Sequence, residues 1–342
     1  MKKIIIVILT AMLTLSLSGM TLSEELVQSI GDANIGVAII DSNGDTIEIN
    51  GDKHYPMMSV FKFHQAIAIS QHLGYPGILT KRCPIDDGDM CSDTWSPMLR
   101  DFPGGLTSAD LTLLLKYSLI ESDNNACDII FKNLLSPFQT DSLMHSFYPG
   151  DYAICQTERE MNNNISLCYN NYSTPKAAAG LVDKFFVHHG SEAALVVKAL
   201  MGGTKTGLSR IKAGLGAGAT LFHKTGTGHC EDDYIQAVND IGIVLYTRPD
   251  GTTGYYSIAV FVKDFKGSLE EAEKQIADIS NIAWRHLAVD FPKTLSNLSS
   301  KAPTVGIKPN VPEENPQNGP NFLGQLAGAM LEGILDGMLM NE

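Results

Sequence analysis

The chain has 342 residues, a formal net charge of −13 at pH 7, and 44% hydrophobic residues. A chain of this size can bury a full core and suits one large domain better than two small ones. The negative charge argues against a nucleic-acid partner. The sequence contains no P-loop, no dinucleotide fingerprint and no metal-ligand spacing among its nine histidines, so neither a cofactor nor a metal is expected.

The first 19 residues have the pattern of a Sec signal peptide. Lys2 and Lys3 precede an apolar run at residues 4–17, and small residues follow it. A single membrane anchor is the alternative, but the run is short and the chain then turns polar at Ser23. The pattern predicts export, so the mature chain, from residue 20, is expected in the periplasm or outside the cell.

Strand-like runs lie near both ends of the mature chain, with helical patterns between them. A polar turn at 42–45 joins the runs 35–40 and 46–49 and predicts a β-hairpin. Three later strand-like runs and a closing amphipathic helix occupy residues 219–223, 241–246, 256–262 and 268–287. These patterns predict an α+β fold, an α/β sandwich in which a five-stranded antiparallel sheet is flanked by helices beside an inserted all-helical region.

Ser59-Val60-Phe61-Lys62 lies where Pro56 discourages a helix and apolar residues at helical spacing follow. Ser59 is therefore expected near a helix N-terminus. Because residues three apart share a helix face, the Lys62 amine can reach the Ser59 hydroxyl. The positive end of the helix dipole also favours a developing alkoxide there. The alternative is that Ser59 only caps the helix and Lys62 is a solvated charge.

A Ser-Asp-Asn motif at residues 122–124 separates two helical patterns, 106–120 and 124–135. The first pattern is expected to open at Thr107. The motif is typical of a short loop whose side chains face a cleft, with Asp123 fixing the loop through backbone N–H groups. A polar turn between helices, without any chemical role, is the alternative.

Lys224-Thr225-Gly226-Thr227 continues the extended run at 219–223. Alternation along a strand places Lys224 and Gly226 on one face and Thr225 and Thr227 on the other. Because Gly226 has no Cβ atom, a planar amide ligand can lie against the strand edge and take backbone hydrogen bonds. The alternative is a glycine-containing strand end.

In this order, the three motifs resemble those of class A serine β-lactamases, most closely the cephalosporinase, or extended-spectrum, branch. The resemblance covers residues 33–287 and rests on the stretches 57–62, 122–126, 223–226 and 259–265. It implies a catalytic domain at residues 20–290, expected to be monomeric, that hydrolyses the β-lactam amide of cephalosporins and penicillins through a serine acyl-enzyme. β-Lactam antibiotics are then the partners, and antibiotic resistance is the consequence.

The resemblance implies a role for each motif residue. Ser59 is the nucleophile, Lys62 is its base or proton relay, and Ser122 is the proton donor to the lactam nitrogen. The backbone N–H groups of Ser59 and Thr227 form the oxyanion hole. The expected substrate-binding residues, which line the cleft or bind the acylamido group, the water and the carboxylate, are Trp95, Asn124, Asn162, Arg210, Lys224, Thr225, Gly226 and Thr227.

Glu158 separates the two enzyme classes that share these motifs. Penicillin-binding D,D-peptidases also acylate on serine but lack a base that activates water against the acyl-enzyme. Glu158 and Asn162, four residues apart, match the base and the amide that hold this water in the omega loop of the lactamase family, and Pro175 closes that loop. Glu160 is the local competitor. A D,D-peptidase or a β-lactam sensor that does not hydrolyse remains the alternative.

The omega loop departs from the family pattern at its neck. The expected arginine–aspartate bridge is replaced by Gln156 and Asn171, which leaves the anchoring of the loop open. Export makes disulfides permissible for the six cysteines. Cys83–Cys91 and Cys155–Cys168 are the candidate pairs, and Cys127 and Cys230 are expected to be unpaired, although spacing does not determine the connectivity.

The chain continues beyond the resemblance. Residues 291–321 are rich in Pro, Asn and Ser and predict a flexible linker. Residues 322–342 predict an amphipathic helix, since Phe322 to Met340 has apolar residues over most of a helical surface and glycines at small-x-x-x-small spacing. Such a helix suits a membrane face, self-association or a partner. A tail with no role is the alternative.

Overall fold

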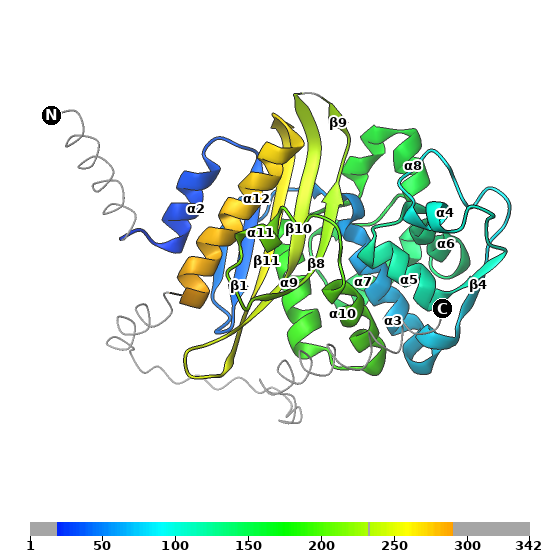
Figure 1. Cartoon of the computed structure of the whole chain (residues 1–342), viewed down its shortest axis with the longest axis horizontal. Helices are drawn as coiled ribbons and strands as arrows, with labels where there is room; N and C mark the ends of the chain where they lie inside the picture. Colours follow the sequence, from blue (N-terminus) through cyan, green and yellow to red (C-terminus); the bar gives the residue numbers. More distant parts are fainter. Residues whose placement is uncertain (1–18, 232, 290–342) are drawn as a thin grey trace.

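The structure is a computed structural model that describes residues 19–231 and 233–289 (Figure 1). The predicted signal peptide at 1–19, apart from Gly19, lies outside the described residues. The predicted linker at 291–321 and the predicted helix at 322–342 lie outside them as well. Within the described part, no helix is both long enough and apolar enough to cross a bilayer.

The centre of the molecule is an antiparallel sheet with the strand order β2-β1-β11-β10-β8. Its strands are β1 (Ile35–Asp41), β2 (Thr46–Ile49), β8 (Thr220–Thr227), β10 (Tyr234–Thr247) and β11 (Thr253–Lys266). The short β9 (Cys230–Glu231) pairs with β10 as a sixth strand. The predicted five-stranded antiparallel sheet and the α+β fold are therefore confirmed. Strands from both ends of the chain meet in it, because β1 pairs with β11.

Helices cover both faces of the sheet. In Figure 1, α2 (Leu22–Ile30) lies beside α12 (Leu269–Trp284) over one face, and the short α11 (Ile211–Gly214) packs under α12. Apolar side chains of α2 and α12 form a core with one face of the sheet, as predicted for the amphipathic closing helix. That helix begins where Ser268 and Glu271 form a reciprocal capping box.

A larger core lies on the other face, where α9 (Pro175–Asp183) and α10 (Glu192–Gly202) separate the sheet from the all-helical region. That region contains α3 (Phe61–Thr80), α4 (Pro97–Asp101), α5 (Leu111–Ile120), α6 (Asn124–Asn133), α7 (Pro137–Phe147) and α8 (Glu158–Asn163). The remaining short elements are η1 (Met58–Val60), η2 (Ile165–Asn170), η3 (Lys184–His188), η4 (Arg285–Val289), β3 (Tyr55–Pro56), β4 (Arg82–Pro84), β5 (Ser108–Asp110), β6 (Tyr152–Ala153) and β7 (Tyr172–Ser173).

The predicted helix at 106–120 begins later than its pattern indicated. Residues 108–110 form β5, which pairs with β4, and the helix starts at Leu111 with Asp110 as its N-cap. The prediction of a start at Thr107 was therefore wrong, because backbone pairing with a strand 26 residues earlier replaces the first helical turn. The pattern at 124–135 is confirmed as a helix that ends at Asn133.

All six cysteines are unpaired in the structure, so the candidate disulfides Cys83–Cys91 and Cys155–Cys168 are not formed. Cys83 is buried in the core of the all-helical region, whereas the Cys91 thiol lies outside it and donates to Asp93 at 2.6 Å. Cys168 is also buried, whereas Cys155 is exposed. In each candidate pair, one cysteine lies in the interior and the other lies nearer the surface. The short spacing in the sequence gave no sign of this difference in burial.

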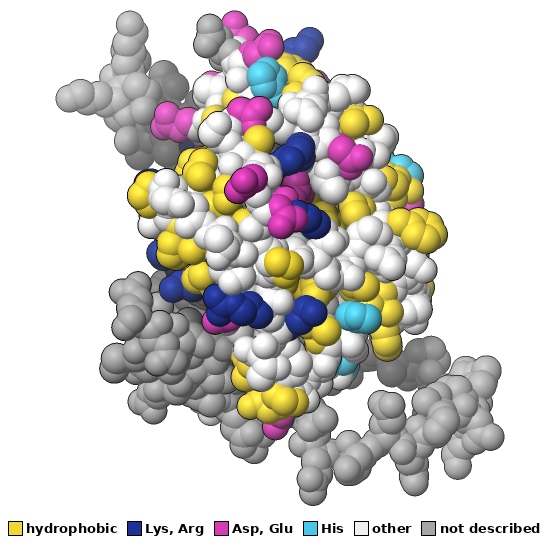
Figure 2. Space-filling model, turned by 90° about the vertical axis from the view of Figure 1, so that its right-hand side faces the viewer, with side chains coloured by type: hydrophobic (Ala, Val, Ile, Leu, Met, Phe, Trp, Pro, Cys, Tyr) yellow, Lys and Arg dark blue, Asp and Glu magenta, His cyan; other side chains and the backbone are white. Residues whose placement is uncertain are grey.

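The helical side of the molecule carries charges of both signs. Figure 2 shows acidic and basic side chains interspersed over this face, with hydrophobic side chains among them. Lys132, which bridges Asp86 and Asp89 at 2.7 Å each, is an example of the local pairing. Exposed pairs of this kind add little stability.

Candidate active site

Ser59 lies in the single turn η1, directly before α3. The preceding Met58 has a φ of 48°, a conformation that non-glycine residues rarely adopt and that occurs preferentially at functional sites. The Lys62 ammonium lies 3.0 Å from the Ser59 hydroxyl, as the three-residue spacing predicted. The Ser59 hydroxyl in turn donates to Glu158 Oε1 at 3.2 Å.

Lys62 is fully buried at the centre of the site. Its ammonium donates to Asn124 Oδ1 at 2.6 Å and to the Ser122 carbonyl at 2.8 Å, and it lies 2.9 Å from Glu158 Oε1. A buried ammonium needs an opposite charge or several acceptors, and Lys62 has both. The amine therefore joins the first motif, the second motif and Glu158 in one network.

The loop with Ser122 is held in a strained backbone conformation, since Ser122 has a φ of 60°. Asp123 fixes the loop as predicted, because its carboxylate accepts the backbone N–H groups of Met98 at 2.7 Å and Ala126 at 2.8 Å. This arrangement leaves the Ser122 hydroxyl 2.8 Å from the Lys224 ammonium. The second and third motifs therefore meet at one hydrogen bond.

Lys224 is fully buried on β8. Burial holds the pKa of this amine well below its usual value, and the nearby positive charge of Lys62 lowers the pKa further. A lysine in these surroundings releases a proton more readily than a solvated one. The hydrogen bond to Ser122 gives that proton a direct route to a hydroxyl.

Glu158 is the first residue of α8, and only 8% of it is exposed. Glu160, the competing carboxylate, closes a capping box with Thr157, its Oε2 accepting the Thr157 N–H at 2.8 Å. Asp128 on α6 accepts the backbone N–H groups of Glu158 and Arg159, each at 2.8 Å. Glu160 is therefore engaged at the start of the helix, whereas Glu158 faces Ser59.

Asp128 was not identified from the sequence. Burial, followed by the negative charge of Glu158, raises the pKa of Asp128 to about 6. Its position four residues after Asn124 on one helix was the available signal, since residues at this spacing share a face. The spacing alone could not assign a role to Asp128, because that role depends on α8 beginning next to α6.

The omega loop comprises residues 155–173. Its neck, where the two ends of the loop meet, is anchored without an ion pair. The buried Asn171 side chain accepts the backbone N–H groups of Cys155 at 2.7 Å and Gln156 at 2.8 Å. It also donates to the Gln156 carbonyl at 3.0 Å. The doubt about anchoring is therefore resolved, because one neutral amide supplies three hydrogen bonds where an ion pair was missing.

Asn124 and Trp95 line the opposite wall of the cleft. The Asn124 amide donates to the Thr94 hydroxyl at 2.8 Å, in addition to accepting from Lys62. Trp95 is 61% exposed, and its indole N–H donates to the Glu121 carbonyl at 2.9 Å. The ring is thus held at the cleft and is not a plug in the core. Asn162 also lines the cleft, with its amide donating to the Asp93 carbonyl at 3.3 Å.

β8 forms the third side of the site, and Thr225 and Thr227 line the cleft. Gly226 faces the nucleophile, since a Cβ atom there would lie 2.4 Å from the Met57 carbonyl and 3.3 Å from the Ser59 nitrogen. The sequence suggested that Gly226 makes room for a ligand. The structure adds that it lets the strand approach the backbone before Ser59.

Arg210 reaches β8 from the loop before α11. Its guanidinium donates to the Thr227 hydroxyl at 2.6 Å and to the Gly226 carbonyl at 3.1 Å. It also pairs with Glu273 of α12 at 3.1 Å. Arg210 is therefore beside the third motif, as expected, but its charge is partly compensated by a carboxylate that the sequence did not reveal.

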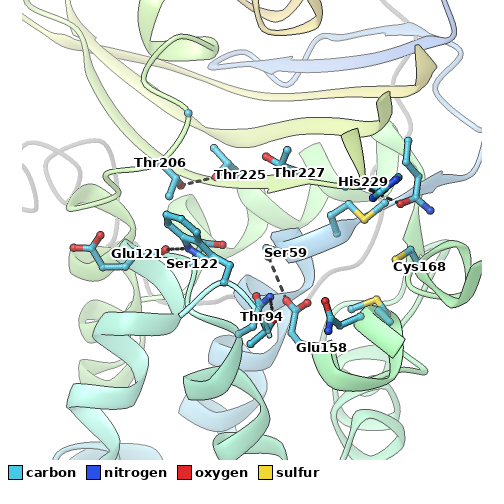
Figure 3. Close-up of a pocket in the computed structure, with 18 of the residues that line it drawn as sticks. Ser59, Thr94, Glu121, Ser122, Glu158, Cys168, Thr206, Thr225, Thr227 and His229 are labelled. Atoms are coloured by element: carbon cyan, nitrogen blue, oxygen red, sulfur yellow. Dashed lines mark hydrogen bonds between the residues drawn. The ribbon is translucent and has the colours of Figure 1, made fainter. Parts of the chain in front are cut away.

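One open cleft of about 1050 Å³ lies between the sheet and the all-helical region. Of the predicted site residues, its lining includes Ser59, Trp95, Ser122, Asn124, Glu158, Asn162, Arg210, Thr225 and Thr227, whereas Lys62 and Lys224 are fully buried behind it. Figure 3 shows Ser59 and Glu158 facing each other across its floor, with Thr225 and Thr227 on the wall above. The volume suits a small-molecule ligand. Among residues 19–231 and 233–289, no group of three or more His, Cys, Asp or Glu side chains could hold a metal ion.

Residues 21–287 match a family model whose description is the β-lactamase enzyme family. The chain belongs to this family. Its motifs and its relatives make it a class A serine β-lactamase, which hydrolyses β-lactams.

Curated relatives of this β-lactamase include a β-lactamase of Phocaeicola vulgatus, with 38% identity over 73% of this chain and 79% of the relative. β-Lactamase VEB-1 of Pseudomonas aeruginosa is 32% identical over 83% of this chain and 97% of its own length. Among solved structures, a class A β-lactamase from Bacteroides cellulosilyticus has a TM-score of 0.72 and 29% identity, covering 79% of this chain and 99% of that one. The TLA-1 extended-spectrum β-lactamase has a TM-score of 0.73 and 30% identity, covering 78% and 98%.

Proposed function

We propose that this β-lactamase acts through an acyl-enzyme formed on Ser59. In the first half-reaction, either Glu158 or Lys62 in its neutral amine form accepts the proton of the Ser59 hydroxyl, while the Ser59 oxygen attacks the lactam carbonyl. The carbon–nitrogen bond breaks, and Ser122 donates its proton to the ring nitrogen, which Lys224 then replaces. The backbone N–H groups of Ser59 and Thr227 stabilise the oxyanion.

In the second half-reaction, Glu158 takes a proton from a water molecule, and the resulting hydroxide attacks the ester carbonyl. The proton taken up in acylation first returns to Lys224 through Ser122. Asn162 orients the water, and Glu158 passes the proton of this water to the departing ester oxygen, which regenerates the Ser59 hydroxyl. The observation that carries the proposal is the convergence on the Ser59 hydroxyl of Lys62 at 3.0 Å and Glu158 at 3.2 Å. One group can serve acylation while the other remains available for hydrolysis of the ester.

Cephalosporins are the proposed preferred substrates. Thr225 and Thr227 offer hydroxyls, and Arg210 offers positive charge, to a carboxylate bound along β8, while the buried Lys224 reaches the site through the Ser122 hydroxyl. Support comes from relatives that are named extended-spectrum β-lactamases. One of them, PER-1 of Pseudomonas aeruginosa, is 30% identical over 77% of this chain. In our proposal, the catalytic domain at 20–290 is a monomer, is exported to the periplasm or beyond, and is followed by the linker and the tail helix.

The test is the Glu158→Ala variant of the mature protein with nitrocefin. Acylation is expected to remain detectable, whereas deacylation falls by at least about 10²-fold, because no carboxylate activates the water. Intact-protein mass spectrometry then shows a persistent adduct on the variant, and on Ser59 after digestion. Glu160→Ala is the matched control and should turn over like the parent enzyme. Steady turnover by Glu158→Ala would contradict the assignment of the base.

The same assay separates the alternative functions. If the parent enzyme hydrolyses nitrocefin and its colour changes at a steady rate, the protein is a lactamase. A single burst of colour change, with no further turnover, indicates a D,D-peptidase or a sensor. No reaction at all would indicate an inactive relative.

A further inference from the structure

The side chain of Asn239 joins the central sheet to the segment that leads into Ser59. Asn239 lies on β10 and is fully buried. Its Nδ2 group donates to the Pro56 carbonyl at 2.8 Å and to the Met57 carbonyl at 3.1 Å. The mechanism described above gives this amide no role, although its two bonds fix the backbone directly before the nucleophile.

The register of the sheet explains how the Asn239 amide reaches this segment. β10 and β8 pair Asn239 with Gly226, so the two residues are cross-strand neighbours on one face. A Cβ atom at Gly226 would lie 2.4 Å from the Met57 carbonyl oxygen. The Met57 carbonyl therefore occupies the space that Gly226 leaves free, where the longer side chain of Asn239 reaches it.

Met57 is held from both sides. Its N–H donates to the Asn171 carbonyl, in the neck of the omega loop, at 2.7 Å. Its carbonyl accepts the Asn239 amide and also the Val60 N–H at 3.1 Å, the bond that closes the turn η1 around Ser59. Asn239 thus fixes the peptide group on which the turn of the nucleophile is built.

Two features of this segment work against stability. Met58, between Met57 and Ser59, has a φ of 48°, and such a conformation persists only where surrounding contacts demand it. The Asn239 Oδ1 atom is buried without a hydrogen-bond partner in the described part of the chain, which also destabilises a fold. Both features lie at the backbone that presents the Ser59 N–H group, so stability alone does not explain them.

The place of this N–H group matters for the oxyanion hole, and here the inference rests on the proposed function. The N–H groups of Ser59 and Thr227 must point at one oxygen, which requires the turn η1 to be held against β8. Gly226, directly before Thr227, is the point of closest approach, since its Cβ atom would lie 3.3 Å from the Ser59 nitrogen. We propose that Asn239 holds η1 against β8 and so aligns the oxyanion hole. Asn239 touches no substrate and is a positioning residue.

Asn239→Leu keeps the approximate size of the side chain and removes both bonds. Loss of a whole oxyanion-hole donor lowers kcat by about 10²–10³-fold, so a displaced donor should lower kcat for nitrocefin by about tenfold. Because the hole serves both half-reactions, KM should change by less than about twofold.

Asn133→Leu is the matched control. The Asn133 amide also donates to two backbone carbonyls, those of Pro84 at 3.1 Å and Ile129 at 2.9 Å. Asn133 is the last residue of α6 and does not line the cleft. This control should therefore keep the parental kcat and KM.

The infrared spectrum of the acyl-enzyme separates a positioning role from a general loss of stability. On the Glu158→Ala background, a cephalosporin with an isotopic label at its lactam carbonyl carbon gives an adduct whose ester band can be isolated. Hydrogen bonds from the hole weaken the C=O bond and lower its stretching frequency. Adding Asn239→Leu should move the band to a higher wavenumber, whereas adding Asn133→Leu should leave it in place.

Asn239→Ala provides a second variant in case leucine does not fit beside the carbonyls. Its smaller side chain also removes both bonds and cannot clash, so the same shift of the ester band is expected. An ester band that stays in place in both Asn239 variants, or an equal shift in Asn133→Leu, would overturn the proposal.

Failure of the proposed function gives a different result. In that case Glu158→Ala forms no persistent adduct on Ser59, with or without a change at Asn239. If only the positioning proposal fails, the adduct forms in every variant and its ester band has one frequency.

Discussion

Buried titratable side chains set the behaviour of this protein at the scale of single residues. Lys224 is fully buried, and burial, followed by the positive charge of Lys62, lowers its pKa. Asp128 behaves in the opposite sense, since burial raises the pKa of this acid to about 6. Each shift follows from which form of the group is charged and how far water is excluded.

His64 gives the clearest prediction at this scale. It lies fully buried on α3 against the edge of Tyr152, and burial lowers its pKa from 6.5 to about 4. The unfolded chain therefore binds a proton between these pH values that the folded chain does not, so acid favours unfolding over this window. The stability that depends on neutral His64 is complete above pH 6.5 and is lost as the pH falls to about 4.

His64→Leu is expected to remove this pH dependence. Between pH 6.5 and about pH 4, the free energy of unfolding of the parent should fall by about 3 kcal/mol more than that of the variant. Urea titrations near pH 7 and near pH 4 measure the difference. His72→Leu, an exposed change on the same helix, is the control and should keep the parental slope. Equal slopes in parent and His64→Leu would show that another group carries the acid sensitivity.

At the scale of elements, the omega loop is held by hydrogen bonds between side chains and backbone N–H and carbonyl groups. Thr157 and Glu160 cap α8, Asp128 accepts its first N–H groups, and Asn171 closes the neck. None of these contacts joins opposite charges directly. Apart from the buried ion pair of Glu158 with Lys62, which salt screens little, the loop depends on hydrogen-bond geometry. It is therefore expected to be less sensitive to salt than a loop held by an exposed ion pair.

Asn171→Ala should destabilise this loop. The change leaves the N–H groups of Cys155 and Gln156 and one carbonyl without their partner, at a cost of about 2–4 kcal/mol. Faster amide hydrogen exchange at residues 155–156 and a lower kcat for deacylation are the expected results. Asn170→Ala, at the exposed neighbouring position, should change neither. Parental exchange rates in Asn171→Ala would show that the neck is anchored elsewhere.

At the scale of the whole molecule, the site lies where two separately packed units meet. One core is formed by the sheet with α2 and α12, and the other joins its opposite face to the all-helical region. β8 faces the loop of Ser122 across the cleft, and the chain crosses between the units before and after the helical region (Figure 1). The two cores thus act as rigid supports for catalytic groups on their facing edges.

Truncation after Val289 tests whether this arrangement is self-sufficient. Neither core cluster of the described residues extends beyond Ala288, so the shortened protein should keep kcat/KM for nitrocefin and melt within about 2 °C of the full chain. If residues 322–342 anchor or associate, only membrane fractionation or the sedimentation coefficient should change. A large loss of activity would show that the C-terminal residues support the catalytic domain.

Local patterns were sufficient for several features. The hairpin of β1 and β2 follows from a polar turn between apolar runs, and the Ser59–Lys62 contact follows from helical spacing. Features that depend on distant pairing were missed. Residues 108–110 became a strand because β4 supplied partners, and the role of Asn171 depended on which backbone groups the neck exposed.

The sequence by itself determined the family, the order of the three motifs and the alternation of polar and apolar faces, because these depend on residue type and on spacing of a few residues. Only the tertiary structure decided how Glu158 is aimed by Asp128, how Arg210 is balanced by Glu273, and how Asn239 meets Met57. These contacts join residues 30 to 182 positions apart, so they arise from the packing of whole elements and leave no periodic signal in the chain.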